Sequence, residues 1–304
     1  MIELVKDSNI NFIGVRHIAI TCSIIALLTG VGSVIFHRGL NFSIDFAGGT
    51  LIQVKFQKPV VDDIAKIRLI ITDLGYGSPE VKTIGQIDKN EIQIMVRKQS
   101  DGTAVADGVK SALQKNYTDN TFEVRRVENV GPKIGGELRR NAIIASLLLL
   151  LAILIYIGFR FNVPFGVAAV IPLFHDSLIT ITAFSLLNRE ISLPFLAALL
   201  MIIGYSLNDT IVIFDRIREN LKGGLRSRKF EDIINGSINQ TLSRTIITSA
   251  TTLIVVLFLF ILGSEAIKDF ALALLIGIGV GTYSSVYIAS PVLIWWQKRW
   301  PLVK

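Results

Sequence analysis

Residues 193–214 read LPFLAALLMIIGYSLNDTIVIF, an apolar run in which Asp209 is the only charged side chain. A helix needs about 20 mostly apolar residues to cross the hydrocarbon core of a bilayer, so this run predicts a membrane span. Further runs of similar character occur along the chain. We expect six spans, at residues 18–36, 142–159, 163–187, 193–214, 245–262 and 270–296.

The composition of the 304 residues agrees with a membrane protein. Charged residues make up 18% and hydrophobic residues 51%, and the mean hydropathy is +0.56. Typical globular proteins carry roughly 25% charged residues. The single cysteine, Cys22, excludes an intrachain disulfide framework and a cysteine-based zinc site. The net charge of +7 would suit nucleic acid, anionic lipid or the positive-inside rule, and only the positions of the charges decide among them.

The basic residues set the predicted orientation. With the N-terminus in the cytoplasm, most basic residues of the tails and short loops fall on the cytoplasmic side, with the highest density at residues 216–229. The short outer loops hold only Arg189 and Lys268. Arg38, Lys133, Arg139 and Arg140 oppose this bias, because they flank the large loop on the outside. The bias still predicts cytoplasmic segments at 1–17 and 297–304 and favours a topology anchor over a nucleic-acid patch.

The large loop, residues 37–141, is long enough to form a domain of its own outside the membrane. Alternating apolar residues predict strands at 50–56, 81–87, 91–96 and 122–130, and helical spacing predicts helices at 60–74 and 103–113. The order β-α-β-β-α-β is typical of the ferredoxin-like fold. We therefore predict an α-helical membrane protein with six transmembrane helices and one extracytoplasmic α+β domain.

Charged residues inside spans are candidates for function, because each costs at least ~2.5–3.5 kcal/mol to place at the centre of a bilayer. Asp209 lies near one end of its span, and Arg244 stands at the start of the next span, so the two could form an ion pair. Such a pair could open when Asp209 takes up a proton, or it could be static and fix helix packing. His175 and Asp176 could extend a polar path from Asp209 or bond a neighbouring helix.

The sequence lacks common nucleotide-binding and catalytic motifs, and one small-residue motif suits helix packing. Residues 131–138, GPKIGGEL, have the glycine spacing of a phosphate-binding loop but lack its Lys-Ser/Thr pair. Neither HExxH nor GxSxG occurs in the sequence, so we expect no enzyme and no metal or other cofactor. Ala273, Gly277 and Gly281 form a small-residue face in the last span, which favours packing within the chain over a partner subunit.

An ordered set of motifs resembles SecF, a protein-export membrane subunit of the SecD/SecF family in the resistance-nodulation-division superfamily. DFAGGT at 45–50 is similar to its DFxGGT motif, and VGPKIGGEL at 130–138 is similar to its VGPxVGxEL segment. His175-Asp176 matches a pair in its third span. Residues 204–220 resemble its fourth-span signature, and residues 243–245 match the start of its fifth span.

This resemblance implies a SecD/SecF-type auxiliary subunit of the Sec translocase in the bacterial inner membrane. Both termini would be cytoplasmic and the large loop periplasmic. The implied partners are SecD, the SecYEG channel, YajC and translocating preproteins. The implied activity is use of the proton-motive force to promote preprotein export.

The resemblance also implies roles for individual residues. The fourth-span carboxylate and the fifth-span arginine of the family are its proton-relay residues, and those positions here are Asp209 and Arg244. We add His175, Asp176 and Asn208 as relay candidates. The candidate hinge or docking residues of the outer domain are Asp45, Gly48, Gly49, Thr50, Gly131, Gly135 and Glu137.

Two alternatives to this reading stay open, as does the coupling ion. The chain could be a half-size proton-driven exporter of lipids or small molecules, or a scaffold that stabilises the translocon without transporting anything. Sodium is an alternative to the proton, because carboxylate and hydroxyl oxygens bind either ion.

Overall fold

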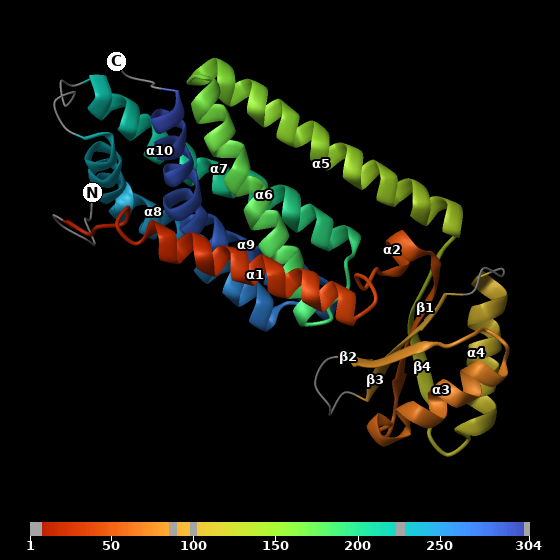
Figure 1. The fold of residues 1–304 in the computed structure, drawn as a ribbon. Coiled ribbons are helices and arrows are strands. Elements are labelled where there is room, and N and C mark those ends of the chain that lie inside the picture. Colours follow the sequence, from red (N-terminus) through yellow and green to blue (C-terminus); the bar gives the residue numbers. More distant parts are fainter. Residues whose placement is uncertain (1–7, 85–89, 98–101, 223–228, 301–304) are drawn as a thin grey trace. The chain divides into compact units, whose positions relative to one another are not determined.

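The computed structural model describes residues 8–84, 90–97, 102–222 and 229–300 (Figure 1). The chain divides into two compact units. The first comprises the described residues of 1–41 and 145–304, and the second comprises Phe42–Ile144. Helix α5, Pro132–Arg160, contributes to both units.

The first unit is built from long helices. Among the residues described, six helical segments are long and apolar enough to cross a membrane, in agreement with the six predicted spans. Many large apolar side chains on them are exposed, as expected of surfaces that face lipid. Besides α5, the helices are α1 Arg16–Phe36, α6 Val163–Leu186, α7 Leu193–Lys222, α8 Phe230–Leu262, α9 Glu265–Ser284 and α10 Ser290–Arg299.

Two helices extend well beyond their apolar runs. Helix α7 continues to Lys222, and α8 begins at Phe230 although its apolar run begins near residue 245. The early turns of α8 bury Ile233, Ile234 and Ile238 against the bundle while their other faces stay polar. Hydropathy marks only the uniformly apolar part of a helix, so these amphipathic turns lay outside the predicted spans.

The sixth predicted span is not one continuous α-helix. Between α9 and α10 the chain forms a π-helical turn, η4, at Ser285–Ala289. Pro291 follows in the first turn of α10 and has no backbone N–H to donate. A π turn widens the helix locally and accommodates the missing hydrogen bond. Within this turn Ser290 Oγ donates to the carbonyl oxygen of Ser285 at 3.3 Å.

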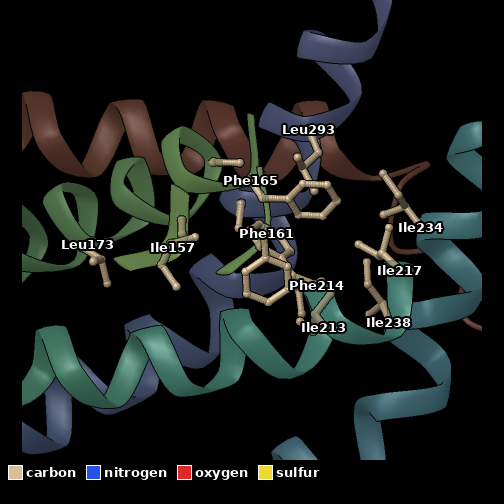
Figure 2. Packing of buried hydrophobic residues seen from close by; sticks show 14 of the residues in the cluster. Ile157, Phe161, Phe165, Leu173, Ile213, Phe214, Ile217, Ile234, Ile238 and Leu293 are labelled. Carbon is tan, nitrogen blue, oxygen red and sulfur yellow. The ribbon is translucent and has the colours of Figure 1, made fainter. Parts of the chain in front are cut away.

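Aromatic side chains fill the core where α5, α6 and α7 meet (Figure 2). Phe165 packs against Phe161 and Phe214, with ring centroids 5.8 and 5.2 Å apart. Around these rings Figure 2 shows Ile157, Ile213 and other aliphatic side chains pointing into the same cluster. Large buried rings contribute strongly to packing, so this core fixes the helices that carry the polar residues described below.

The second unit contains one antiparallel sheet with the strand order β2-β3-β1-β4. This order, with a helix after β1 and after β3, is the ferredoxin-like arrangement, so the predicted fold class is confirmed. The strands are β1 Gly49–Phe56, β2 Glu80–Ile84, β3 Glu91–Val96 and β4 Phe122–Val130, and the helical elements are α2 Ile44–Ala47, η1 Val61–Asp63, α3 Ile64–Asp73 and α4 Gly102–Asn116. The predicted second strand ended at residue 87, and its last residues lie outside the described part of the chain.

Helices α3 and α4 cover one face of this sheet (Figure 1). Ile52, Val54 and Phe56 alternate along β1 and are almost completely buried. They pack against residues of both helices, such as Ile67 and Val109. The strand period of two and the helix period of 3.6 therefore direct their apolar residues into one core.

Candidate functional site

Asp209 lies within α7 and is 1% exposed. Its Oδ2 atom accepts hydrogen bonds from Ser249 Oγ of α8 at 3.2 Å and from Thr282 Oγ1 of α9 at 3.5 Å. The two hydroxyl oxygens are themselves 2.8 Å apart. No cation of the described residues lies within ion-pair distance of this carboxylate. Asp209 is therefore a buried carboxylate held by hydroxyl groups from two neighbouring helices.

Asp176 forms a second buried carboxylate site, on α6, and is fully buried. Its Oδ2 atom accepts hydrogen bonds from Ser206 Oγ at 2.6 Å and Ser284 Oγ at 2.8 Å. Its Oδ1 atom lies 3.0 Å from Nδ1 of His175. An ionised carboxylate only accepts, so His175 would donate to it from Nδ1. The Nε2 atom of His175 is buried and has no hydrogen-bond partner among the described residues.

The same two helices serve both carboxylates. Ser206 precedes Asp209 on α7, and Thr282 precedes Ser284 on α9. A Cβ atom on Gly281 would lie 3.0 Å from Cβ of Ser206, so the missing side chain lets α9 approach α7 closely. The small-residue face of the last span therefore packs within the chain, as the sequence favoured.

Arg244 does not pair with Asp209 in this structure. Its side chain is exposed on α8, and no ion pair joins it to the described carboxylates. Five residues separate Arg244 from Ser249, which does contact Asp209. At about 100° per residue this turns Arg244 roughly 140° around the helix, away from Asp209. The expected ion pair is thus absent, because Arg244 lies on a different side of α8 from Ser249, which contacts Asp209.

Asn208 also faces outward. It precedes Asp209 on α7, yet its side chain is exposed whereas that of Asp209 is buried. Neighbouring residues of a helix point about 100° apart, so one can line the interior while the other faces the surface. The structure therefore separates the relay candidates into a buried group (Asp209, Asp176, His175) and an exposed group (Asn208, Arg244).

In the second unit the DFAGGT motif runs from α2 directly into β1. Ser43 Oγ accepts from the backbone N–H of Asp45 at 3.3 Å, and the same hydroxyl lies 3.1 Å from Oδ2 of Asp45. Gly48 and Gly49 have φ values of +74° and +133°, which residues with a Cβ rarely adopt. A Cβ atom on Gly49 would lie 2.5 Å from the carbonyl oxygen of Val96. Thr50 is buried, and its Oγ1 is 3.4 Å from Oδ1 of Asn129.

The start of α5 packs directly on this junction of α2 and β1. A Cβ atom on Gly135 would lie 3.1 Å from the backbone nitrogen of Gly48 and 3.3 Å from the backbone of Phe46. Gly131 has open space around it, and Glu137 is exposed. The structure thus brings the two glycine motifs of the second unit together. Close backbone packing accounts for Gly48, Gly49 and Gly135, and the hinge role stays a prediction.

Sequence reasoning missed three of the hydroxyl groups at the carboxylates, namely those of Ser206, Thr282 and Ser284. Small polar residues in otherwise apolar spans commonly bond across helices, and this signal could have found them. It could not have assigned each hydroxyl to its carboxylate, because the assignment depends on how the helices are rotated about their axes.

Comparison with known proteins identifies the family. The family described as "Protein export membrane protein SecD/SecF, C-terminal" matches residues 109–299, and the "SecD/SecF GG Motif" matches residues 33–60. A protein translocase subunit SecF of Desulfurispirillum indicum is 49% identical over 271 residues, covering 86% of this chain and 84% of the relative. The chain belongs to the SecF family.

Other SecF-family relatives agree with this assignment. The SecF subunit of Magnetococcus marinus is 47% identical and covers 95% of this chain and 92% of its own length. The crystal structure of SecDF from Thermus thermophilus superposes with a TM-score of 0.84 at 40% identity, over 96% of this chain. The chain spans only 39% of that SecDF protein.

Both groups of candidate residues fall within the matched parts of the SecF family. The GG motif of residues 33–60 contains Gly48 and Gly49. The C-terminal match of residues 109–299 contains Asp176, Asp209 and Arg244. The chain is therefore a multi-pass translocase component of the SecF family. Proteins of this family are transport components and not enzymes.

Proposed function

We propose that this SecF-family chain couples the proton-motive force to preprotein export across the bacterial inner membrane, as an auxiliary subunit of the Sec translocase. Asp209 would take up and release the coupled proton. SecD, the SecYEG channel and YajC would be its partners, and preproteins its substrate. Both termini would be cytoplasmic, and the unit Phe42–Ile144 would lie in the periplasm.

The observation that carries the proposal is the surroundings of Asp209. The carboxylate is 1% exposed, and its described partners are the hydroxyls of Ser249 and Thr282. An ionised carboxylate is costly to bury without a cation, so gain or loss of a proton changes the energy of the local packing substantially. Because the two hydroxyls come from α8 and α9, that change acts on contacts among three helices.

Asp176 and His175 support a second step in the same bundle. Ser206 bonds Asp176 and lies one helical turn before Asp209, so a rotation of α7 that moves one carboxylate contact must also move the other. The buried Nε2 of His175 has no hydrogen-bond partner among the described residues, so it offers a free polar atom beside Asp176. We assign Asp176 and His175 the role of extending the polar path that begins at Asp209.

The exposed positions of Arg244 and Asn208 support a partner subunit within the membrane. Arg244, Thr251 and Phe258 follow one another at seven-residue spacing and share one exposed face of α8. Arginine and asparagine are costly against lipid, whereas a neighbouring polar helix would satisfy them. SecD is the partner that we propose for this face, and Arg244 would exchange its contacts there as Asp209 changes charge.

The available energy is adequate for such a change. One elementary charge that crosses 100 mV releases ~2.3 kcal/mol, comparable to the cost of losing a buried hydrogen bond. Movement of the bundle would reach the periplasmic unit, and that unit would reorient while it holds the emerging chain. Gly48, Gly49, Gly131 and Gly135, with Asp45, Thr50 and Glu137, are the residues that we propose for the joint.

The test is preprotein translocation into membrane vesicles that contain the full chain and SecD, with and without a proton gradient. Asp209→Asn keeps the size of the side chain and removes its charge, and we expect it to abolish the increase in export that the gradient produces. Asp215→Asn is the matched control, because Asp215 is a half-exposed carboxylate of the same helix that pairs with Arg160 at 3.6 Å. Arg244→Ala should also lose the increase.

Three outcomes would contradict the proposal. Gradient-stimulated export that survives both Asp209→Asn and Arg244→Ala would favour the scaffold. A sodium gradient that replaces the proton gradient would identify the other coupling ion. Proton-dependent loss of lipids or small molecules from vesicles that lack SecD would favour the half-size exporter.

A further inference from the structure

A pocket with a volume of about 480 Å³ lies at the start of α5, within the unit Phe42–Ile144. One wall is Phe46 of α2, and the other is a face of α5 that includes Arg139, Arg140, Ile143 and Ile144. The pocket thus combines two guanidinium groups with apolar side chains. The proposed relay uses none of these four residues of α5.

The continuity of α5 fixes the depth of this pocket relative to a membrane. The helix runs unbroken through Pro132–Arg160, and its uncharged segment begins at Ala142. At a rise of 1.5 Å per residue, Arg140 lies about 3 Å along the axis from that boundary. Ile143 and Ile144 occupy the first turn inside it. With the membrane boundary at Ala142, the guanidinium groups would lie at headgroup level and the isoleucines where acyl chains begin.

The positive charges at this pocket have no ion-pair partner among the residues that the structure describes. Lys133, Arg139 and Arg140 are exposed, and none of them forms an ion pair with another described residue. Glu137 lies on the same helix but beyond ion-pair distance of all three. The guanidinium carbon of Arg139 lies 5.3 Å from the ring centre of Phe42, which orients the group without neutralising it.

The walls of the pocket are held together by backbone contacts. Gly135 packs against Gly48 and Phe46 at distances that leave no room for a Cβ atom without a backbone shift. Phe46 is itself 7% exposed. The pocket is therefore a shaped part of the fold, and its basic side chains project from a fixed base.

We propose that this pocket binds an anionic phospholipid from the leaflet that adjoins the N-terminal end of α5. Arg139 and Arg140 hold the phosphate, because guanidinium groups match phosphate oxygens with paired N–H donors. The first methylenes of an acyl chain lie against Ile143 and Ile144. A membrane lipid fits better than a soluble phosphate, because the apolar part of the pocket continues into the uncharged run of α5.

This inference also explains why basic residues stand on the side of the membrane that the positive-inside pattern disfavours. A bound anionic headgroup neutralises them and ties the joint between α2 and α5 to the membrane surface. Binding does not depend on Asp209, so failure of the lipid proposal and failure of proton coupling are separable results.

The test uses the full chain in nanodiscs made of phosphatidylcholine and phosphatidylglycerol. After extraction into detergent, native mass spectrometry measures which lipid the protein retains. Each basic residue near an anionic surface contributes about fivefold in binding, so Arg139→Gln with Arg140→Gln should weaken phosphatidylglycerol retention about thirtyfold. Arg125→Gln with Arg126→Gln is the matched control, because both arginines are exposed on β4 of the same unit. The control should retain lipid like the unmodified chain.

Other arms keep the proposal falsifiable. The double variant Arg139→Lys with Arg140→Lys preserves the charge, and we expect it to lose less phosphatidylglycerol retention than the double glutamine variant. It replaces the glutamine variant if that variant does not fold. Equal retention by the 139/140 and 125/126 variants would overturn the proposal. Equal retention of phosphatidylcholine and phosphatidylglycerol would overturn it as well. Displacement of the lipid by millimolar glycerol phosphate would overturn it in favour of a soluble anion.

Discussion

Asp176 and Ser206 are joined by a hydrogen bond of 2.6 Å between Oδ2 of the carboxylate on α6 and Oγ of the hydroxyl on α7. Ser206 lies one helical turn before Asp209, which bonds α8 and α9 through Ser249 and Thr282. Helix α7 thus carries both Ser206, which donates to Asp176, and the second buried carboxylate, Asp209. Movement of α7 at either site must change the contacts of both.

Ser206→Ala should destabilise the bundle by about 1–3 kcal/mol, because it removes one of the donors to a fully buried carboxylate. The change can be measured as a shift in unfolding of the full chain in detergent. Ser177→Ala is the control, because the Ser177 hydroxyl donates only to Leu173 of its own helix at 2.8 Å. Equal losses in the two variants would show that the bond to Asp176 carries no special stability.

Gly277→Ala should cost about 1–3 kcal/mol through overpacking, because the new Cβ would lie 2.2 Å from Cδ1 of Ile202 on α7. Combining it with Ile202→Ala should cost less than the sum of the single changes, since the shortened side chain makes room. Gly279→Ala on the same helix meets no atom within 4 Å and should be neutral or slightly stabilising. Additive costs in the double variant would argue against close α7–α9 packing.

Gly49→Ala should destabilise the second unit by about 3 kcal/mol or more, because it combines a φ of +133° with a backbone clash against Val96. Hydrogen exchange of the β1 and β4 amides provides the readout. Gly136→Ala is the control, since no atom lies within 4 Å of its Cβ position. If Gly49→Ala exchanged as slowly as the control, close packing would not explain this glycine.

Asn239→Ala should loosen the segment that precedes α1, which Asn235 continues to hold through bonds to Ile10 and Ile13. The Asn239 side chain accepts from the backbone N–H of Ile10 and donates to the carbonyl oxygen of Ile10, both at 2.9 Å. Both bonds are lost, and loss of the one from the Ile10 N–H, worth about 1 kcal/mol, should speed exchange of that amide several-fold. Asn116→Ala, which loses only a bond to Ala112 within α4, should leave that amide unchanged. Unaltered exchange at Ile10 in the Asn239 variant would contradict this role.

Sequence patterns predicted the elements well where the physical signal is local. Long apolar runs indicated six membrane helices, and the alternation of Ile52, Val54 and Phe56 indicated a strand with one buried face. The patterns failed where a helix leaves the apolar region, as at the first turns of α8. They also missed η4, because a single proline near the end of an apolar run does not reveal how the chain rearranges around it.

The candidate site was predicted only in part. Asp209, Asp176 and His175 stood out because charged or polar groups are rare in apolar runs, and all three are buried. The suggested pairing of Asp209 with Arg244 is not formed, since proximity along the spans says nothing about which side of a helix each residue occupies. The sequence predicts a hinge at the glycines of residues 45–50. The structure shows close backbone contacts at Gly48, Gly49 and Gly135, and the hinge role stays a prediction.

The sequence by itself determined the membrane class, the β-α-β-β-α-β order and the identity of the buried carboxylates, because hydropathy and residue periodicity act over a few turns of chain. Only the tertiary structure decided which hydroxyls reach them: Ser284 is 108 residues from Asp176, and Thr282 is 73 residues from Asp209. When a helix is apolar on every side, its sequence does not indicate how the helix is rotated about its axis. Packing with its neighbours sets that rotation, and the rotation decides which polar groups meet.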